Sequence, residues 1–342
     1  MDFGAFILFQ RLDESVATKD VYRHSLDLVC RAEELGFSTA WFPEHHLIHY
    51  VSCPSPLMMT VAAAARTSKI RLGTAIAVAP YYHPIRLAGE IAQADTLTGG
   101  RLEIGIGRGA VNYEFARFGV DSKLASARFF ESASVVKRFL SEEEVEHQGE
   151  FWNFPASTTV PRPAQTPFPR MWVAARSIDT IRWSIGNGFN VMTNVGWGEP
   201  FTVIEQVAQQ VNAAIREINP PVRPKFGVSR VCFVAETDAL AREAMRAAQV
   251  SSRIFSRLFR DQVEVRNGFP VPEPLEGEAS AEHLSETLVV GSPATCIEKL
   301  KRYKEIGVDH FMMFVFGPDQ ASMKRSMELF GTEVMPYFSD TK

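Results

Sequence analysis

Two adjacent histidines near the start of the chain are the clearest candidates for proton transfer. The apolar run Thr39–Pro43 is followed by Glu44, His45 and His46. An imidazole takes up or releases a proton near neutral pH, which suits general acid or base chemistry. Neighbouring side chains at a strand end point in opposite directions, so only one histidine can face a site. A histidine in this place can equally be structural, and the residue types alone leave both interpretations open.

A second group of residues has the chemistry of a phosphate site. The run Gly105–Gly109 allows a ligand to approach the backbone closely, and Arg108 within it carries a planar fork of N–H donors. Arg176, Ser177 and Thr180 stand where a helix is expected to begin, and free N–H groups at a helix start favour an anion. The same residues can instead cap the helix and form a surface ion pair. The glycine run also fits the G-x-G-x-x-G/A dinucleotide fingerprint loosely, but it follows the fourth predicted strand instead of the first.

The histidine pair also raises the question of a metal site. The sequence contains no H-E-x-x-H, no H-x-H after the first predicted strand and no later carboxylate cluster. We therefore predict no metal ligands, although a metal-dependent barrel hydrolase remains an alternative.

Eight short apolar runs alternate with longer amphipathic segments, and this alternation must position the polar residues. The runs are hydrophobic throughout, as in parallel strands covered on both faces. The predicted strands are Phe3–Phe9, Thr39–Pro43, Ile70–Ala77, Leu102–Gly107, Met171–Ala175, Asn190–Asn194, Phe226–Val234 and His310–Phe316. The predicted helices are Val21–Leu35, Pro56–Thr67, Pro84–Leu97, Ala125–Leu140, Ile178–Asn187, Phe201–Ile218, Ala239–Phe259 and Pro293–Ile306. This pattern predicts an α/β fold, a closed (β/α)8 or TIM barrel whose strand ends meet at one mouth.

Helix boundaries carry their own signals. Gly36, Gly188 and Gly307 each stand just past a predicted helix and just before a strand, where a left-handed cap belongs. Ser292 followed by Pro293 is typical of a helix start.

Two segments interrupt the alternation. Residues 141–165 are charged and then rich in proline, and they predict a surface insertion with a short hairpin around Glu150–Phe154. Residues 260–286 hold three prolines and several acids, which predicts a long loop without regular structure. Because this loop follows the seventh strand and helix, we expect it to act as a lid over the barrel mouth.

Composition favours one large domain, residues 1–342, in the cytoplasm. Of the 342 residues 46% are hydrophobic, and the net charge of −4 gives no electrostatic reason to expect nucleic acid or an anionic membrane as partner. The N-terminal run lacks a basic flank and a cleavage site, and no stretch approaches the roughly 18 apolar residues of a spanning helix. Cys30, Cys53, Cys232 and Cys296 are far apart beside apolar residues, which predicts buried free thiols.

In their order and spacing the motifs resemble the bacterial luciferase-like flavin monooxygenases, and the catalytic subunit of luciferase most of all. The resemblance runs nearly from end to end. It is carried by Met1–Phe6, Glu44–His46, His83–Arg86, Gly99–Leu102, Gly105–Gly109, Val173–Trp183, Gly291–Pro293, Ser326–Phe330 and Val334–Pro336.

The resemblance implies a two-component monooxygenase. Reduced FMN, supplied by a separate flavin reductase, would react with O2 to form a C4a-peroxyflavin and oxygenate a small, largely apolar organic substrate. His45 matches the catalytic histidine beside the flavin, and Ala75-Ile76 matches a non-prolyl cis peptide under the flavin ring. Together with the phosphate site, the expected cofactor-binding residues are Ala75, Ile76, Gly107, Arg108, Arg176, Ser177, Thr180 and Asn194.

The expected substrate pocket is apolar and lined by aromatic residues. Its predicted members are Phe6, Phe9, Trp41, Glu44, Tyr81, Tyr82, His83, Trp197 and Phe316. Three positions depart from luciferase and argue against light emission from a long-chain aldehyde. Gly107 replaces a reactive cysteine and should leave more room, Arg176 replaces a common acidic residue and should add positive charge at the phosphate, and Val195 replaces a pocket tryptophan.

Two further interpretations share this barrel. One is an F420-dependent oxidoreductase that transfers hydride without oxygen. The other is a non-catalytic flavin-binding accessory subunit, which in luciferase lacks the counterparts of His45, of the Arg108-Gly109 pair and of the long lid. By analogy with the family we expect a homodimer.

Overall fold

The computed structural model describes residues 1–339, and the centre of this part of the chain is a closed barrel of eight parallel strands. In order around the barrel these are β1 (Asp2–Phe6), β2 (Thr39–Phe42), β3 (Arg71–Val78), β4 (Leu102–Gly107), β7 (Arg170–Ala174), β8 (Asn190–Asn194), β9 (Phe226–Val234) and β13 (His310–Val315). Strand β9 pairs with both β8 and β13, and β13 pairs with β1, which closes the ring. The predicted (β/α)8 barrel is confirmed.

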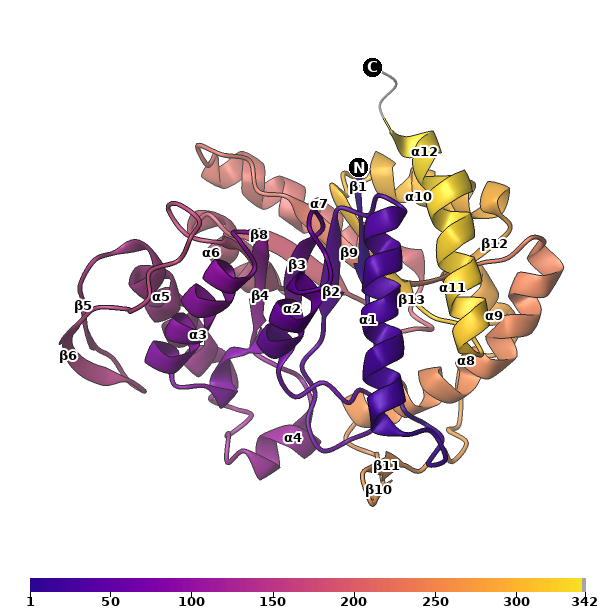
Figure 1. Cartoon of the computed structure of the whole chain (residues 1–342), viewed down its shortest axis with the longest axis horizontal. Helices are drawn as coiled ribbons and strands as arrows, with labels where there is room; N and C mark the ends of the chain where they lie inside the picture. The colour runs from indigo at the N-terminus through magenta and orange to yellow at the C-terminus, as the bar shows by residue number, and fades with distance from the viewer. Residues whose placement is uncertain (340–342) are drawn as a thin grey trace.

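Helices surround the barrel (Figure 1), and most of them lie within a few residues of the predicted segments. These are α1 (Thr18–Glu34), α2 (Pro56–Ala64), α3 (Pro84–Leu97), α5 (Ala125–Ser141), α6 (Ile178–Gly186), α7 (Phe201–Ile218), α8 (Asp238–Phe259) and α10 (Pro293–Glu305). The predicted caps are present: Gly36, Gly188 and Gly307 have φ of 84°, 74° and 93°. The Ser292 side chain accepts a hydrogen bond from the N–H of Thr295. Among residues 1–339 no helix is long and apolar enough to cross a membrane.

Several short elements were not predicted from the sequence. They are the turn η1 (Ala79–Tyr81), α4 (Asn112–Arg117), α9 (Ala281–Thr287), β12 (Val289–Gly291), α11 (Gln320–Leu329), the π-helical turn η2 (Phe330–Val334) and α12 (Met335–Phe338). Strand β12 pairs with the end of β9 beyond the part that β8 covers.

Both interruptions of the alternation contain ordered hairpins. Strands β5 (Val145–Gln148) and β6 (Asn153–Ser157) form the hairpin predicted in the insertion. The lid segment was wrongly predicted to lack regular structure, because it holds the hairpin of β10 (Val265–Arg266) and β11 (Phe269–Pro270) and most of α9.

Two arginines on α8 hold the proline-rich part of the lid in place. Arg253 binds both carboxylate oxygens of Glu278, at 2.5 and 2.6 Å. Arg257 donates to the carbonyls of Glu273 and Pro274, at 3.0 Å each. These carbonyls belong to a stretch whose prolines cannot donate backbone hydrogen bonds, so the side chains of α8 supply the missing partners.

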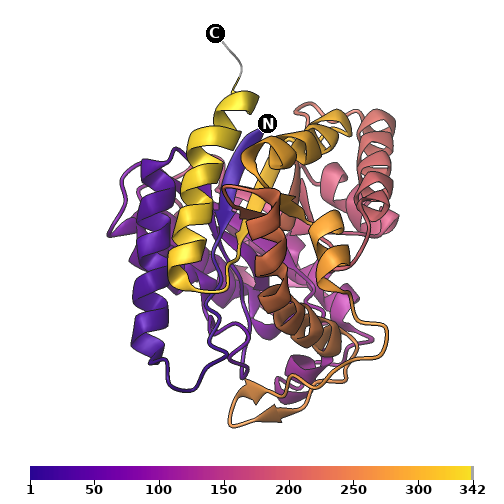
Figure 2. The same cartoon turned by 90° about the vertical axis from the view of Figure 1, so that its right-hand side faces the viewer.

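The two ends of the barrel differ in what they carry. Figures 1 and 2 show the N-terminus and α12 at one end and α4 with the β10–β11 hairpin at the other. Because the strands are parallel and β1 begins beside the N-terminus, the second end is formed by the carboxyl ends of all eight strands. In barrels of this type that end holds the active site.

The interior of the barrel near its amino end is filled by the buried side chains of Trp41, Trp172 and His310. Trp41 is fully buried, and its indole N–H donates to Nε2 of His310 at 2.9 Å. Burial lowers the pKa of His310 to about 3, so this imidazole is neutral and can accept. The Trp41 ring lies against Gly73, where an added Cβ would overlap it. Glycine at this position therefore gives the indole its space.

We predict opposite effects of two glycine-to-alanine substitutions. Gly73→Ala should lower the free energy of unfolding by about 1–3 kcal/mol, because the buried Trp41 ring cannot move away. Gly89→Ala, in the interior of α3 with no atom near the added methyl, should raise it by about 0.5–1 kcal/mol. Urea unfolding followed by circular dichroism measures both, and equal effects of the two substitutions would contradict the packing argument.

Candidate active site

A cavity of about 1180 Å³ lies at the carboxyl end of the barrel. A single drug-sized ligand usually occupies a pocket of about 300–1,000 Å³, so this cavity has room for a cofactor and a second small molecule. The residues that follow the strands, one face of α8 and the lid line it. The predicted site residues on its wall are Phe6, Glu44, His45, Ala75, Ile76, Arg108, Arg176, Ser177, Thr180, Asn194 and Trp197.

The other predicted residues lie off the wall of this cavity. Phe9 packs against Tyr22 and Phe42 in the outer core. Trp41 points toward the amino end of the barrel, as described above. Phe316 lies behind Trp197, with the ring centroids 5.4 Å apart.

The turn η1 also removes three predicted residues from the wall. Tyr81 stacks on Phe118 and donates to Oε2 of Glu114 at 3.3 Å. Tyr82 packs against the outer core, where burial raises its pKa. The His83 ring begins α3 by accepting the N–H of Ile85. No strand or helix period in the sequence indicated this turn.

His45 faces the cavity and is held from behind by a carboxylate that the sequence did not point to. Nδ1 of His45 lies 2.9 Å from Oε1 of Glu114, which also accepts the backbone N–H of His46. Burial raises the pKa of Glu114, but the neighbouring imidazole and these hydrogen bonds outweigh it and bring the pKa below its usual range. An ionised carboxylate can only accept, so Nδ1 of His45 carries the proton and Nε2 is left free for a reacting group.

His46 points away from His45 and binds a different carboxylate. Its Nε2 lies 2.9 Å from Oε1 of Glu44, and the other oxygen of Glu44 accepts the N–H of Val78 at 2.8 Å. Burial of Glu44 prevails over these contacts and raises its pKa. The two histidines therefore do not face a common centre.

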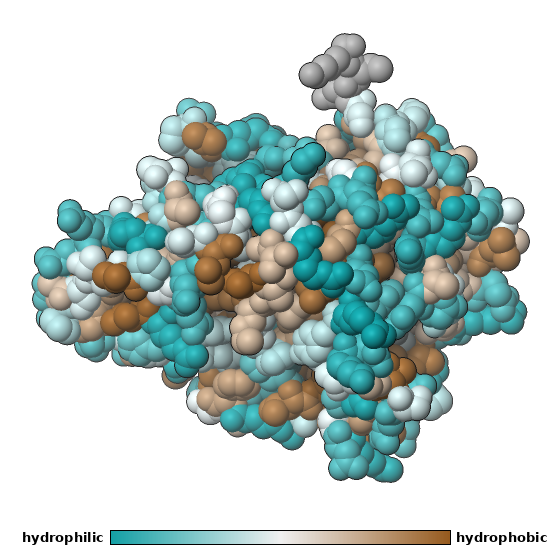
Figure 3. Space-filling view, in the orientation of Figure 1, coloured by the Kyte–Doolittle hydropathy of each residue, from teal (hydrophilic) through white to brown (hydrophobic). Residues whose placement is uncertain are grey.

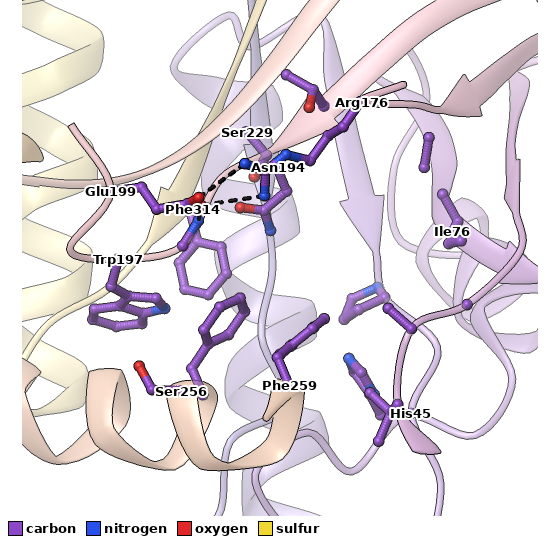
Figure 4. A pocket seen from close by; sticks show the side chains of 18 of the residues that line it. His45, Ile76, Arg176, Asn194, Trp197, Glu199, Ser229, Ser256, Phe259 and Phe314 are labelled. Carbon is purple, nitrogen blue, oxygen red and sulfur yellow. Dashed lines mark hydrogen bonds and ion pairs between the residues drawn. The ribbon is translucent and has the colours of Figure 1, made fainter. Parts of the chain in front are cut away.

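The predicted phosphate residues Arg108, Arg176, Ser177 and Thr180 all line this cavity. Ser177 is the N-cap of α6, and its hydroxyl lies 2.9 Å from that of Thr180. Arg108 is exposed, and its Nε donates only to the neighbouring carbonyl of Gly109, at 3.2 Å. Arg176 pairs with Glu199 at 2.8 Å (Figure 4). Helix capping and an anion site are both compatible with this arrangement, because Ser177 caps α6 while Ser177 and Thr180 also line the cavity.

A buried arginine fixes the loop that carries Trp197 and Glu199. Arg230, on β9, is 1% exposed and donates to the carbonyls of Gly196 and Glu199, at 2.7 and 2.5 Å. It also donates to the carbonyl of Thr287, at the end of α9, at 3.1 Å. One guanidinium thus joins the loop after β8 to the end of the lid.

One face of α8 forms a further part of the wall that the sequence did not reveal. Ser252, Phe255, Ser256 and Phe259 are spaced as neighbours on one side of a helix, and all four line the cavity. The helical spacing of apolar residues predicted α8 itself. It could not predict which face of α8 lines the cavity, because that depends on how the helix and the lid pack on the barrel.

Comparison with known proteins places the chain in a family. A sequence model of the luciferase-like monooxygenases matches residues 1–310. Over 353 aligned residues, the chain is 33% identical to the oxygenase component of a flavin-dependent trigonelline monooxygenase from Acinetobacter baylyi, covering 100% of this chain and 97% of that protein. The chain belongs to the luciferase-like monooxygenase family. It is therefore an enzyme of the monooxygenase class.

Solved structures of luciferase-like monooxygenases superpose on nearly the whole chain. The monooxygenase RslO1 from Streptomyces bottropensis gives a TM-score of 0.87 at 25% identity, covering 99% of this chain and 100% of its own. The oxygenating constituent of 3,6-diketocamphane monooxygenase from Pseudomonas putida, in complex with FMN, gives 0.79 at 20% identity over 98% of each chain. The second likeness is one of fold alone.

Relatives with another cofactor also match. An F420-dependent glucose-6-phosphate dehydrogenase from Intrasporangium calvum is 26% identical, covering 92% of this chain and 94% of its own. The luciferase-like barrel is therefore similar to proteins of both cofactor types, and the choice of cofactor must be argued from the site.

The structure changes how two departures from luciferase are understood. Gly107, predicted to contact the cofactor, does not line the cavity and leaves no extra room, because the side chain of Ile76 fills the space that an added Cβ would take. Arg176 does not add an unbalanced positive charge, because Glu199 is paired with it. The pKa of Glu199 lies below its usual range, since the contacts with Arg176 and the N–H of Gly196 outweigh the effect of burial. The bond between Ala75 and Ile76 is cis.

We predict that His45→Ala raises the pKa of Glu114. Burial, which favours the neutral carboxyl, remains in the variant, whereas the imidazole that lowers the pKa is gone. In the wild type the lowered pKa contributes stability that is present above the ordinary value of 4.5 and is lost as the pH falls through the folded-state value. A ¹³C NMR titration of the glutamate carboxyls measures the change, with Glu44 as internal control because His46 is retained. An unchanged pKa of Glu114 would contradict the assignment of His45 as its main partner.

Proposed function

We propose that this luciferase-like monooxygenase uses reduced FMN and O2 to oxygenate a small, largely apolar organic substrate. The reduced FMN would come from a separate flavin reductase. The observation that carries the proposal is that Arg108 and the N-terminal residues of α6 line the same cavity as His45, whose Nδ1 is bound to Glu114. The relative from Acinetobacter baylyi, an oxygenase component, supports the need for a reductase.

The residues of the cavity fit FMN. Arg108, the hydroxyls of Ser177 and Thr180 and the first turn of α6 would hold the phosphate. Ala75 and Ile76, together with Asn194, would contact the flavin itself. When bound, reduced FMN supplies the electrons that activate oxygen.

The protein's own part in the reaction is to hold a proton and exclude water. His45, oriented by Glu114, presents Nε2 to the cavity and would accept or return a proton there. The lid residues Leu275 and Gly277–Ser280 line the same cavity. Arg253 holds Glu278 of this stretch, and Arg257 holds the preceding Glu273 and Pro274. A closed lid keeps bulk water away from reactive groups.

We also propose that the chain forms a homodimer through α2 and α3. Met58 on α2 is 73% exposed and Leu97 on α3 is 57% exposed, although both side chains are apolar. Figure 3 shows hydrophobic side chains over this part of the surface. A second copy would cover them.

We predict that Arg108→Ala weakens binding of FMN much more than binding of riboflavin. Loss of a charged hydrogen bond costs about 1.5–3 kcal/mol, or roughly 10- to 100-fold in affinity, and only FMN carries the phosphate. Fluorescence titration of both flavins measures this difference. Arg182→Ala is the matched control, because Arg182 lies on α6 but pairs with Glu217 at the surface. If Arg108→Ala weakens both flavins equally, the phosphate lies elsewhere.

The oxygen reaction tests the proposed function directly. Photoreduced FMN is mixed with the protein and then with oxygenated buffer in a stopped-flow instrument, for wild type and His45→Ala. Wild type should slow or divide the reoxidation of the flavin into phases that free flavin lacks. The variant should still bind FMN yet approach the behaviour of free flavin, because its cavity has no free imidazole nitrogen. Failure to bind reduced FMN, or reoxidation as in free solution, would refute the monooxygenase proposal and make F420 the next cofactor to test.

A further inference from the structure

Aromatic rings line one part of the cavity. Phe6 and Phe314 stack with their planes at 9° and their centroids 5.2 Å apart. Trp197 meets Phe314 edge to face at 80°. Phe259, on α8, is apolar yet 42% exposed, and Figure 4 shows it between Trp197 and His45. The part of the cavity lined by Phe6, Trp197, Phe259 and Phe314, called the slot below, offers ring surfaces that suit a flat, apolar ligand.

Among residues 1–339, three buried hydroxyls on the cavity wall have no hydrogen-bond partner, those of Tyr50, Thr193 and Ser229, and the last of them lies beside Phe314. Ser229, on β9, is 3% exposed, lines the cavity, and its Oγ makes no hydrogen bond. Its strand neighbours are Asn194 on β8 and Met312 on β13. Figure 4 shows Ser229 beside Asn194 and Phe314. A buried hydroxyl without a partner is costly, so a ligand that occupies the slot should supply a group that bonds to it.

The slot offers no unpaired carboxylate for a cationic group. Each carboxylate that lines the cavity has a basic partner: Glu44 with His46, Glu114 with His45, Glu199 with Arg176 and Glu278 with Arg253. Ser229 lies beside Asn194 and Phe314, and the charges closest to it, Arg176 and Glu199, are paired with each other. The slot therefore suits a neutral ligand that carries a hydrogen-bonding group.

We propose that the substrate is a planar aromatic ring that bears a neutral hydroxyl or carbonyl group. The ring packs against Phe314 and Trp197, and the hydroxyl of Ser229 binds the polar substituent. This inference rests on the proposed function, since it assigns the remainder of the same cavity to the substrate. Ser229 then sets specificity, because it rejects rings that cannot satisfy it.

Isothermal titration calorimetry of the full chain, saturated with oxidised FMN, tests the proposal with three probes. Phenol has the ring and the hydroxyl, toluene has the ring alone, and cyclohexanol has the hydroxyl without a flat ring. Phenol should bind more tightly than either of the others. Ser229→Ala should weaken phenol by about 3- to 10-fold and leave toluene unchanged, so that the loss depends on both hydroxyls.

Two further variants separate recognition from general damage. Phe314→Leu should reduce the preference for phenol over cyclohexanol, because it removes the stacked ring. Ser251→Ala is the matched control, since Ser251 is a buried serine of α8 whose hydroxyl bonds to Gln10 and does not line the cavity. It should leave the ratio of phenol to toluene affinity unchanged. Melting temperatures confirm that each variant is folded.

The outcomes distinguish this inference from the proposed function. If FMN binds but phenol gives no binding heat, or if Ser229→Ala affects phenol and toluene equally, the substrate assignment is overturned while the flavin function stands. If Ser229→Ala weakens FMN itself, Ser229 serves the cofactor and the assignment is likewise overturned. Failure of FMN to bind refutes the proposed function instead.

Discussion

The parallel pairing of eight strands in a closed ring is the constraint on which every other feature depends. Closure through the β9–β8 and β13–β1 pairings forces all the carboxyl ends of the strands to one mouth. Residues as distant in sequence as Phe6 and Phe314 become stacked neighbours because β1 and β13 lie in register, with these two residues paired. The glycines at 4 and 73 are part of the same constraint, since they admit the Trp41 indole that fills the closed amino end.

Each carboxylate that lines the cavity is paired with a basic side chain. Glu114 and Glu44 are both buried carboxyl groups, and each lies beside a histidine. The pKa of one is lowered and that of the other is raised, because Glu114 accepts from an imidazole and a backbone N–H at one oxygen, whereas burial of Glu44 exceeds what its partners return. Environments that separate two carboxyl pKa values are a common basis for acid–base roles. Here the ionised Glu114 orients His45, whose ring lines the cavity.

The sequence was most informative where the physics is local. Apolar runs and amphipathic periods predicted the eight strands and most helices, and glycines at helix ends predicted left-handed caps such as that at Gly36. The strand ends also directed attention to His45, Arg108 and Ser177, which the structure brings to one cavity. Short or irregular elements escaped prediction. The turn η1 rotates Tyr81 away from the cavity, and the six residues of α4, which carry Glu114, are too few to show a period.

Tertiary contacts account for the rest. The lid has the composition of a loop, but its conformation is fixed by Arg257, which donates to its backbone carbonyls, and by Arg253, which binds Glu278. The sequence does not show which arginines of a helix will make such contacts. The role of Arg230 could not be predicted for the same reason. In the sequence it is a charged residue within the apolar strand β9, and only the fold brings the carbonyls of Gly196, Glu199 and Thr287 to its guanidinium. A fully buried guanidinium is tolerated only with such a set of acceptors. Arg230 therefore holds both the loop that carries Trp197 and Glu199, the partner of Arg176, and the end of the lid at Thr287. A displacement of the loop should move the end of the lid as well.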